Sequence, residues 1–155
     1  MNPTPEKTSV MAPFILMLFL YFIVGLFTVI NQQFQVPLKS ALLPHDGNMT
    51  NALVTLLNFS WFLAYPFSEG FATRWVDRLG YRKTSVYSLL IFIVGLGFYE
   101  AAVLLHIYAP SYITIMGNPI FTGFFVFLSG SFVIGMAVTI LQVVTGLYLD
   151  VNPVG

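Results

Sequence analysis

Long stretches without a charged side chain most restrict how this chain can fold. No charge occurs between Lys7 and Lys39, over residues 47–68 or over residues 120–149, and residues 84–105 contain only Glu100. A helix needs about 20 apolar residues to cross the hydrocarbon core of a bilayer. Charged residues make up 8% of the chain, whereas soluble domains average about 25%. The sequence therefore predicts a membrane protein.

Each apolar stretch is expected to be helical, because backbone groups in lipid must find hydrogen-bond partners within their own segment. The predicted fold class is an all-α membrane protein with four transmembrane helices. The expected spans cover about residues 11–36, 51–70, 84–105 and 120–149 of a transmembrane domain at residues 11–150. Residues 1–10 are expected to be an N-terminal tail, and residues 151–155 the start of a link.

Basic side chains gather on one side of these spans. Loops rich in Lys and Arg stay in the cytoplasm, and only Lys39 falls on the outer side. We therefore expect a multi-pass protein of the inner or plasma membrane with a cytoplasmic N-terminus. The outer links, residues 37–51 and 106–119, contain Pro, Gly and Asn and are expected to be turns. The inner side carries Lys7, Arg74, Arg78, Arg82 and Lys83.

The composition also excludes several functional classes. Six basic and six acidic residues give a net charge of zero, so no nucleic-acid partner is indicated. The chain has no cysteine and two isolated histidines, so no metal centre or cofactor is expected. No cluster of nucleophile, base and acid is recognisable, so we do not expect an enzyme.

The inner link carries the most specific pattern, "GFATRWVDRLGYRK" at residues 70–83. Basic residues at a membrane boundary can serve only as anchors. Beyond that role, a central glycine suits a tight reversal with positive φ, and an acid can face the amide-rich start of the next helix. The spacing D-R-x-G-x-R-K comprises Asp77, Arg78, Gly80, Arg82 and Lys83.

This spacing resembles the signature loop of the major facilitator superfamily. The resemblance implies that these five residues help to latch the cytoplasmic side of a transporter built from two six-helix halves. The family pattern has Gly four residues before the Asp, where this chain has Thr73. The four spans would be the first part of the N-terminal six-helix half, and we expect a fragment that transports nothing by itself.

A narrower resemblance, over nearly the whole chain, is to the fucose permease family of proton-coupled sugar symporters. It rests on "LYFIVGLFTVINQQFQVPLK", "LAYPFSEGFATRWVDRLGYRK", "GLGFYEAA" and "GMAVTILQVVTGLYLDVNPVG". It implies transport of a hexose or deoxyhexose, such as fucose, galactose or glucose, by alternating access. Family members carry Asn-Asp where this chain has Gln32 and Gln33, and "AANP" where "VVTG" follows Gln142. A carboxamide cannot titrate, so these positions can bind sugar but cannot carry a coupled proton.

Polar and small residues recur along one side of the first span. Tyr21, Gly25, Thr28, Gln32 and Gln35 follow at helical spacing and share one face. We expect this face to turn from lipid toward a cavity or other helices, where carboxamides can donate to and accept from sugar hydroxyls. Alternatively, these side chains only join helices. The candidate substrate-binding residues are Tyr21, Thr28, Asn31, Gln32, Gln33 and Gln142.

Glu100 is the only carboxylate inside a predicted span. An intramembrane acid is a functional candidate, so Glu100 is the candidate for proton coupling. It also lies near the outer end of its span, where it can reach water. Glu69 and Asp150 are expected to be solvated charges at the cytoplasmic boundary, and Trp61 and Tyr65 are expected to be packing or interface aromatics.

Two other functions compete with that of a sugar carrier. A small multidrug exporter would need a glutamate in the first span, and none occurs there. A non-transporting membrane subunit or regulator needs only four spans and stays open as the alternative. The expected partners are a sugar, protons if transport is coupled, the lipid bilayer and the remaining transporter helices.

Overall fold

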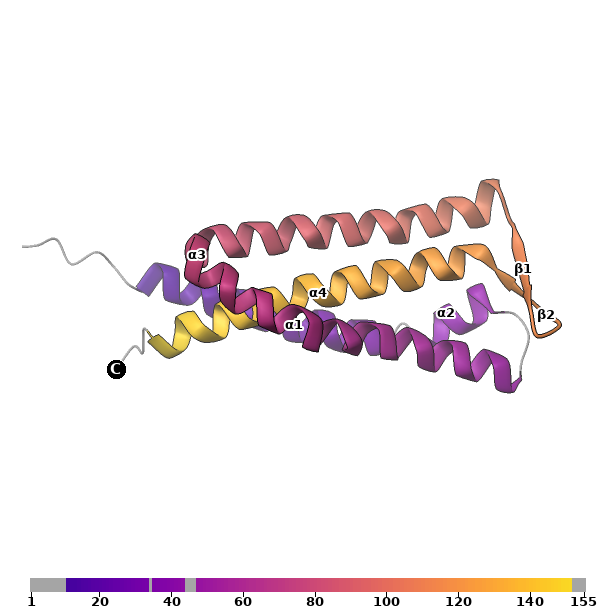
Figure 1. Ribbon diagram of the computed structural model, residues 1–155, viewed down its shortest axis with the longest axis horizontal. Helices are drawn as coiled ribbons and strands as arrows, with labels where there is room; N and C mark the ends of the chain where they lie inside the picture. Colours follow the sequence, from indigo (N-terminus) through magenta and orange to yellow (C-terminus); the bar gives the residue numbers. More distant parts are fainter. Residues whose placement is uncertain (1–10, 34, 44–46, 152–155) are drawn as a thin grey trace, which may run out of the picture.

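The chain folds into a bundle of long helices with a short β-hairpin at one end (Figure 1). The structure, a computed structural model, describes residues 11–33, 35–43 and 47–151. Three of its helices, α1, α3 and α4, are long and apolar enough to cross a membrane. The elements are α1 (Met11–Gln33), α2 (Gln35–Leu42), α3 (Asn48–Tyr108), β1 (Tyr112–Ile115), β2 (Asn118–Phe121) and α4 (Thr122–Val151).

Gly80 divides α3 into a first arm, residues 48–79, and a second arm, residues 81–108, which runs back alongside it (Figure 1). Its φ of 78° and ψ of 165° lie in a region that is essentially reserved for glycine. Thr84 Oγ1 donates to the Gly80 carbonyl at 2.9 Å, and the rings of Tyr81 and Tyr148 pack edge to face at 5.4 Å. The reversal predicted at Gly80 is therefore confirmed.

The helices around this reversal are longer than the predicted spans. Residues 71–79, expected to be part of a link, continue the first arm because Ala72 and Val76 are buried against Ile140 and Val144 of α4. In contrast, α1 ends at residue 33, before the expected boundary at residue 36, and the short helix α2 occupies part of the predicted outer link.

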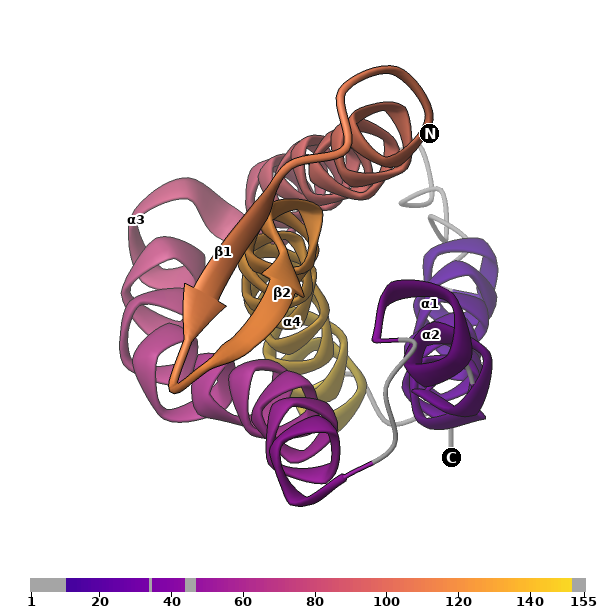
Figure 2. The same ribbon diagram turned by 90° about the vertical axis from the view of Figure 1, so that its right-hand side faces the viewer.

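The second outer link is a β-hairpin, so the all-α expectation is incomplete. Strands β1 and β2 are antiparallel, with Ile115 opposite Asn118. The two residues between them, Met116 and Gly117, have φ of 51° and 82°, as a type I′ hairpin turn requires. Residues Ile120 and Phe121 of β2 are buried, and this anchors the hairpin across the end of the bundle (Figure 2).

Helix α4 lies at the centre of the bundle, between both arms of α3 and α1 (Figure 2). Small residues let it approach closely. A Cβ atom on Gly135 would lie 2.7 Å from the Trp61 carbonyl oxygen of the first arm, and one on Gly130 would lie 2.9 Å from a ring carbon of Tyr99 on the second arm. Because lipid tails are as apolar as the helices, such close contact is a main source of association in a membrane.

Helix α1 packs through one apolar stripe. Met17 and Val24 are buried, and Val24 contacts Val138 and Leu141 of α4. The ring of Phe27 lies 4.9 Å from that of Phe92 on the second arm. The remaining faces of α1 are mostly exposed.

Replacing Gly80 with alanine is expected to destabilise the fold by about 1–3 kcal/mol, because the backbone conformation disfavours any side chain. Unfolding in detergent, followed by circular dichroism, measures this loss. Gly70→Ala is the matched control, since Gly70 lies in the first arm with open space around it. Equal stability of the two variants would contradict the assignment.

Gly135→Ala is expected to lower the free energy of unfolding by about 1–3 kcal/mol, because the added methyl overpacks against the Trp61 backbone. The same unfolding assay applies. Gly146→Ala, on the same helix with nothing within 4 Å of the new methyl, should cost nothing. Loss of stability in both variants would contradict the role of close packing at Gly135, because alanine by itself favours a helix over glycine.

Candidate functional site

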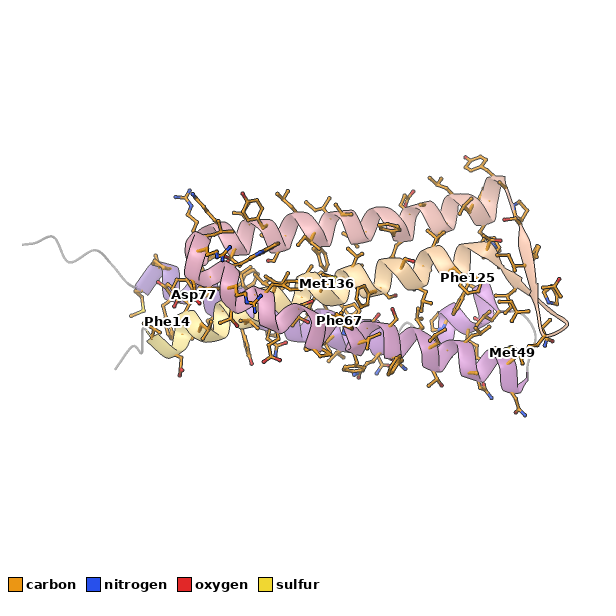
Figure 3. The ribbon with its side chains drawn as sticks, viewed as in Figure 1. Phe14, Met49, Phe67, Asp77, Phe125 and Met136 are labelled. Carbon is orange, nitrogen blue, oxygen red and sulfur yellow. The ribbon has the colours of Figure 1, made fainter. Side chains whose placement is uncertain are left out.

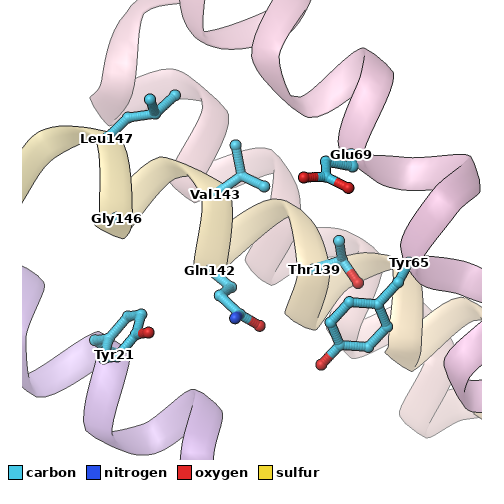
Figure 4. Close-up of a pocket in the computed structure, with 8 residues that line it drawn as sticks. All are labelled: Tyr21, Tyr65, Glu69, Thr139, Gln142, Val143, Gly146 and Leu147. Carbon is cyan, nitrogen blue, oxygen red and sulfur yellow. The ribbon is translucent and has the colours of Figure 1, made fainter.

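An open cleft lies between α1, the first arm of α3 and α4, on the half of the bundle nearer Gly80 (Figure 4). Its volume is about 360 Å³. We call it the Gln142 cleft. It is lined by Tyr21, Tyr65, Glu69, Thr139, Gln142, Val143, Gly146 and Leu147.

The Gln142 cleft offers hydrogen-bonding groups from three elements. The side chains of Tyr21, Tyr65, Glu69 and Gln142 make no hydrogen bond to any described residue. Thr139 is already engaged, because its hydroxyl donates to the Gly135 carbonyl at 2.7 Å. The cleft therefore presents one amide, two phenols and one carboxylate to a ligand.

A second cavity, the Trp61 cavity, lies between α1, both arms of α3 and α4, toward the hairpin end, and has a volume of about 540 Å³. Most of its wall is aromatic or aliphatic, and its polar residues include Asn31 and Glu100. Trp61 is 2% exposed, and its Nε1 is buried without an acceptor among the described residues. The lining is Phe27, Ile30, Asn31, Trp61, Phe92, Leu96, Tyr99, Glu100, Val103, Phe127 and Ile134.

The structure brings some of the predicted substrate residues together and separates others. Tyr21 and Gln142 share the Gln142 cleft, and Asn31 shares the Trp61 cavity with Glu100. Gln32 and Gln33 are exposed and line neither cavity. Thr28 also lines neither cavity; it is half-buried and donates to the Val24 carbonyl at 3.0 Å.

The expectation that the whole polar face of α1 turns inward does not hold within the described helices. The inward stripe is Met17, Leu20, Val24, Phe27 and Asn31, displaced by one position, or about 100°, from the predicted one. Val24 of this stripe packs in one cluster with Val138 and Leu141 of α4. The Phe27 ring packs on Phe92 of the second arm. The predicted polar stripe of α1 therefore lies at the border of the interface between α1 and the rest of the bundle. The contacts of its residues with a substrate stay a prediction.

Sequence reasoning missed Tyr65, Glu69 and Thr139 as cleft residues. Tyr65 and Glu69 are one turn apart on the first arm, and Thr139 lies one turn before Gln142 on α4. This spacing places the members of each pair on one face of a helix, and it could have indicated that they share a site. Ser60, in contrast, has a packing role, because its hydroxyl donates to the Leu128 carbonyl at 3.1 Å.

The charged residues of the predicted gating loop stand on either side of Gly80, at the end of the bundle where Figure 3 labels Asp77. All of them are exposed. No ion pair joins them to another residue in the part of the chain that the structure describes. The reversal is therefore held by packing and by hydrogen bonds such as that from Thr84 Oγ1 to the Gly80 carbonyl. The charged residues of the loop are Asp77, Arg78, Arg82 and Lys83.

What the two cavities can bind is inferred from the residues that line them. No protein-family model, curated protein or solved structure matches this chain. Within residues 11–33, 35–43 and 47–151, no three His, Cys, Asp or Glu side chains gather into a group that could hold a metal ion.

Proposed function

We propose that this chain is part of a membrane carrier for a neutral sugar, a hexose or deoxyhexose such as fucose, galactose or glucose. The observation that supports this most is the Gln142 cleft, a recess between three helices that gathers four polar side chains without hydrogen bonds to described residues. Polar residues within membrane helices are costly unless they serve a site or a partner.

The groups in the cleft suit sugar hydroxyls. The Gln142 amide can donate and accept at once, and the Glu69 carboxylate can accept from two neighbouring hydroxyls. The Tyr21 and Tyr65 rings stand on opposite sides of Gln142 (Figure 4) and offer faces for the apolar side of a sugar ring. A volume of about 360 Å³ falls within the range of small-molecule sites.

Alternating access supplies the mechanism of this proposal. The loop around Gly80 resembles the signature loop of the major facilitator superfamily, and the four long helical segments would be the first part of its N-terminal six-helix half. A second half would close the open side of the Gln142 cleft, and rocking of the halves would expose it to each side in turn.

Proton coupling, where it occurs, needs a group that titrates. Gln33 and Gln142 cannot titrate. Glu100 is our candidate because it lines the Trp61 cavity without an ion-pair partner in the described part of the chain.

A non-transporting membrane subunit or regulator is the second candidate. It is favoured by the exposure of Gln32 and Gln33 on α1, outside both cavities. Carboxamides facing lipid gain hydrogen bonds when another helix covers them. Measurements of sugar uptake distinguish this function from sugar transport.

Gln142→Ala is expected to reduce sugar uptake about tenfold, because the amide can make two hydrogen bonds of about 0.5–1.5 kcal/mol each. Uptake of labelled hexoses by cells expressing the protein within its complete transporter measures the effect, at matched abundance in the membrane. Gln33→Ala removes the same group outside both cavities and should cost less. Unchanged uptake in Gln142→Ala would remove the cleft from the sugar pathway.

Asp77→Asn is expected to slow uptake without changing which sugars compete. The change removes the negative charge that favours the N-terminal end of the second arm, and Asp77 does not line the Gln142 cleft. Competition among unlabelled hexoses gives the selectivity. Asp150→Asn, an exposed acid at the same end on α4, is the control, and altered selectivity in Asp77→Asn would contradict a gating role.

A further inference from the structure

The Trp61 cavity is separate from the Gln142 cleft, because the two linings share no residue. Val24, Val138 and Leu141 fill the space around Trp61 and belong to neither lining. Apart from the buried Nε1 of Trp61, the Trp61 cavity offers only an amide and a carboxylate as hydrogen-bonding side chains that are not already engaged, so it is less suited to a sugar than the Gln142 cleft. We therefore expect the Trp61 cavity to bind a ligand other than a sugar.

The wall of the Trp61 cavity consists largely of aromatic rings that are already packed before a ligand binds. Phe27 packs on Phe92 at 4.9 Å. Tyr99 stacks on Phe127 at 4.0 Å with the ring planes 4° apart, and its hydroxyl is hydrogen-bonded to Ser131 at 2.9 Å. These contacts fix the rings before any ligand arrives, which lowers the entropy lost on binding.

Glu100 is the only charged residue in this wall. No cation of the described chain pairs with it, and Lys39, on α2, donates to Asn51 at 3.1 Å. A carboxylate beside an apolar cavity is stabilised by a positive charge brought close to it. The cavity therefore selects against anions.

Aromatic faces add a second attraction for the same charge. A cation within about 6 Å of a ring centroid is drawn to the ring, most strongly for tryptophan. Tyr99 and three phenylalanines line this cavity, together with Trp61, which is 2% exposed. We infer that the Trp61 cavity binds an apolar molecule that carries one organic cation, with Glu100 as its counter-ion.

Tetraphenylphosphonium is a suitable probe, and tetraphenylborate has the same shape with the opposite charge. Equilibrium dialysis of the full chain in a maltoside detergent should show saturable binding of the phosphonium and no matching binding of the borate. Glu100→Gln should weaken phosphonium binding about tenfold through loss of one ion pair. Glu69→Gln, the same change in the Gln142 cleft, should leave it unchanged.

Fluorescence places the probe in the cavity. The chain has two tryptophans, so Trp75→Phe leaves Trp61 as the reporter. Titration with the phosphonium should change this emission saturably, and Glu100→Gln should shift the midpoint of the change to about tenfold higher concentration. The same dialysis in a phosphocholine detergent shows where the natural cation comes from. If the detergent head group displaces the phosphonium, the natural cation is a lipid head group. If the phosphonium stays bound, the natural cation is a free solute.

Three results would each overturn the inference. They are equal binding of phosphonium and borate, wild-type affinity in Glu100→Gln, and equal losses in Glu100→Gln and Glu69→Gln. Because Glu100 is exposed, its variant should fold, and an unfolding midpoint equal to wild type verifies this. The inference does not rest on sugar carriage, which is tested separately at Gln142.

Discussion

Close contact between α4 and the two arms of α3 is the constraint on which the rest of the structure depends. Gly135 lets the first arm approach, and Gly130 does the same for the second arm. Without water to drive helices together, this contact must come from shape and from a few hydrogen bonds, such as that between Tyr99 and Ser131. Both cavities lie where α1 faces α3 and α4.

The helical parts of the fold could be predicted because the bilayer permits few alternatives. The lengths of the uncharged apolar stretches predicted the positions of the long helices, and Gly80 indicated the reversal. The ends of elements were less predictable, since they depend on partners distant in sequence: Ala72 and Val76 extend the first arm only because α4 covers them. The hairpin was missed because Pro, Gly and Asn indicate a turn without indicating that the flanking residues pair.

The candidate site was predictable in its chemistry but not in its geometry. A polar stripe on α1 was visible in the sequence, yet an apolar stripe one position away competes for the same interface. Leu20 and Val24 pack in one cluster with Val138 and Leu141 of α4, and such packing contacts are what join helices in a membrane. Tyr21 borders the packed stripe and reaches the cleft, whereas Gln32, three turns further on, does not.

The two cavities are linked through the first arm. Trp61 lines one and Tyr65 lines the other, one helical turn apart. A rigid shift of the first arm against α4 would therefore change both at once. Interiors this closely packed move between discrete arrangements and do not deform gradually. A ligand that favours one arrangement at Glu100 would in this way alter the space available at Gln142, in proportion to its difference in affinity for the two arrangements.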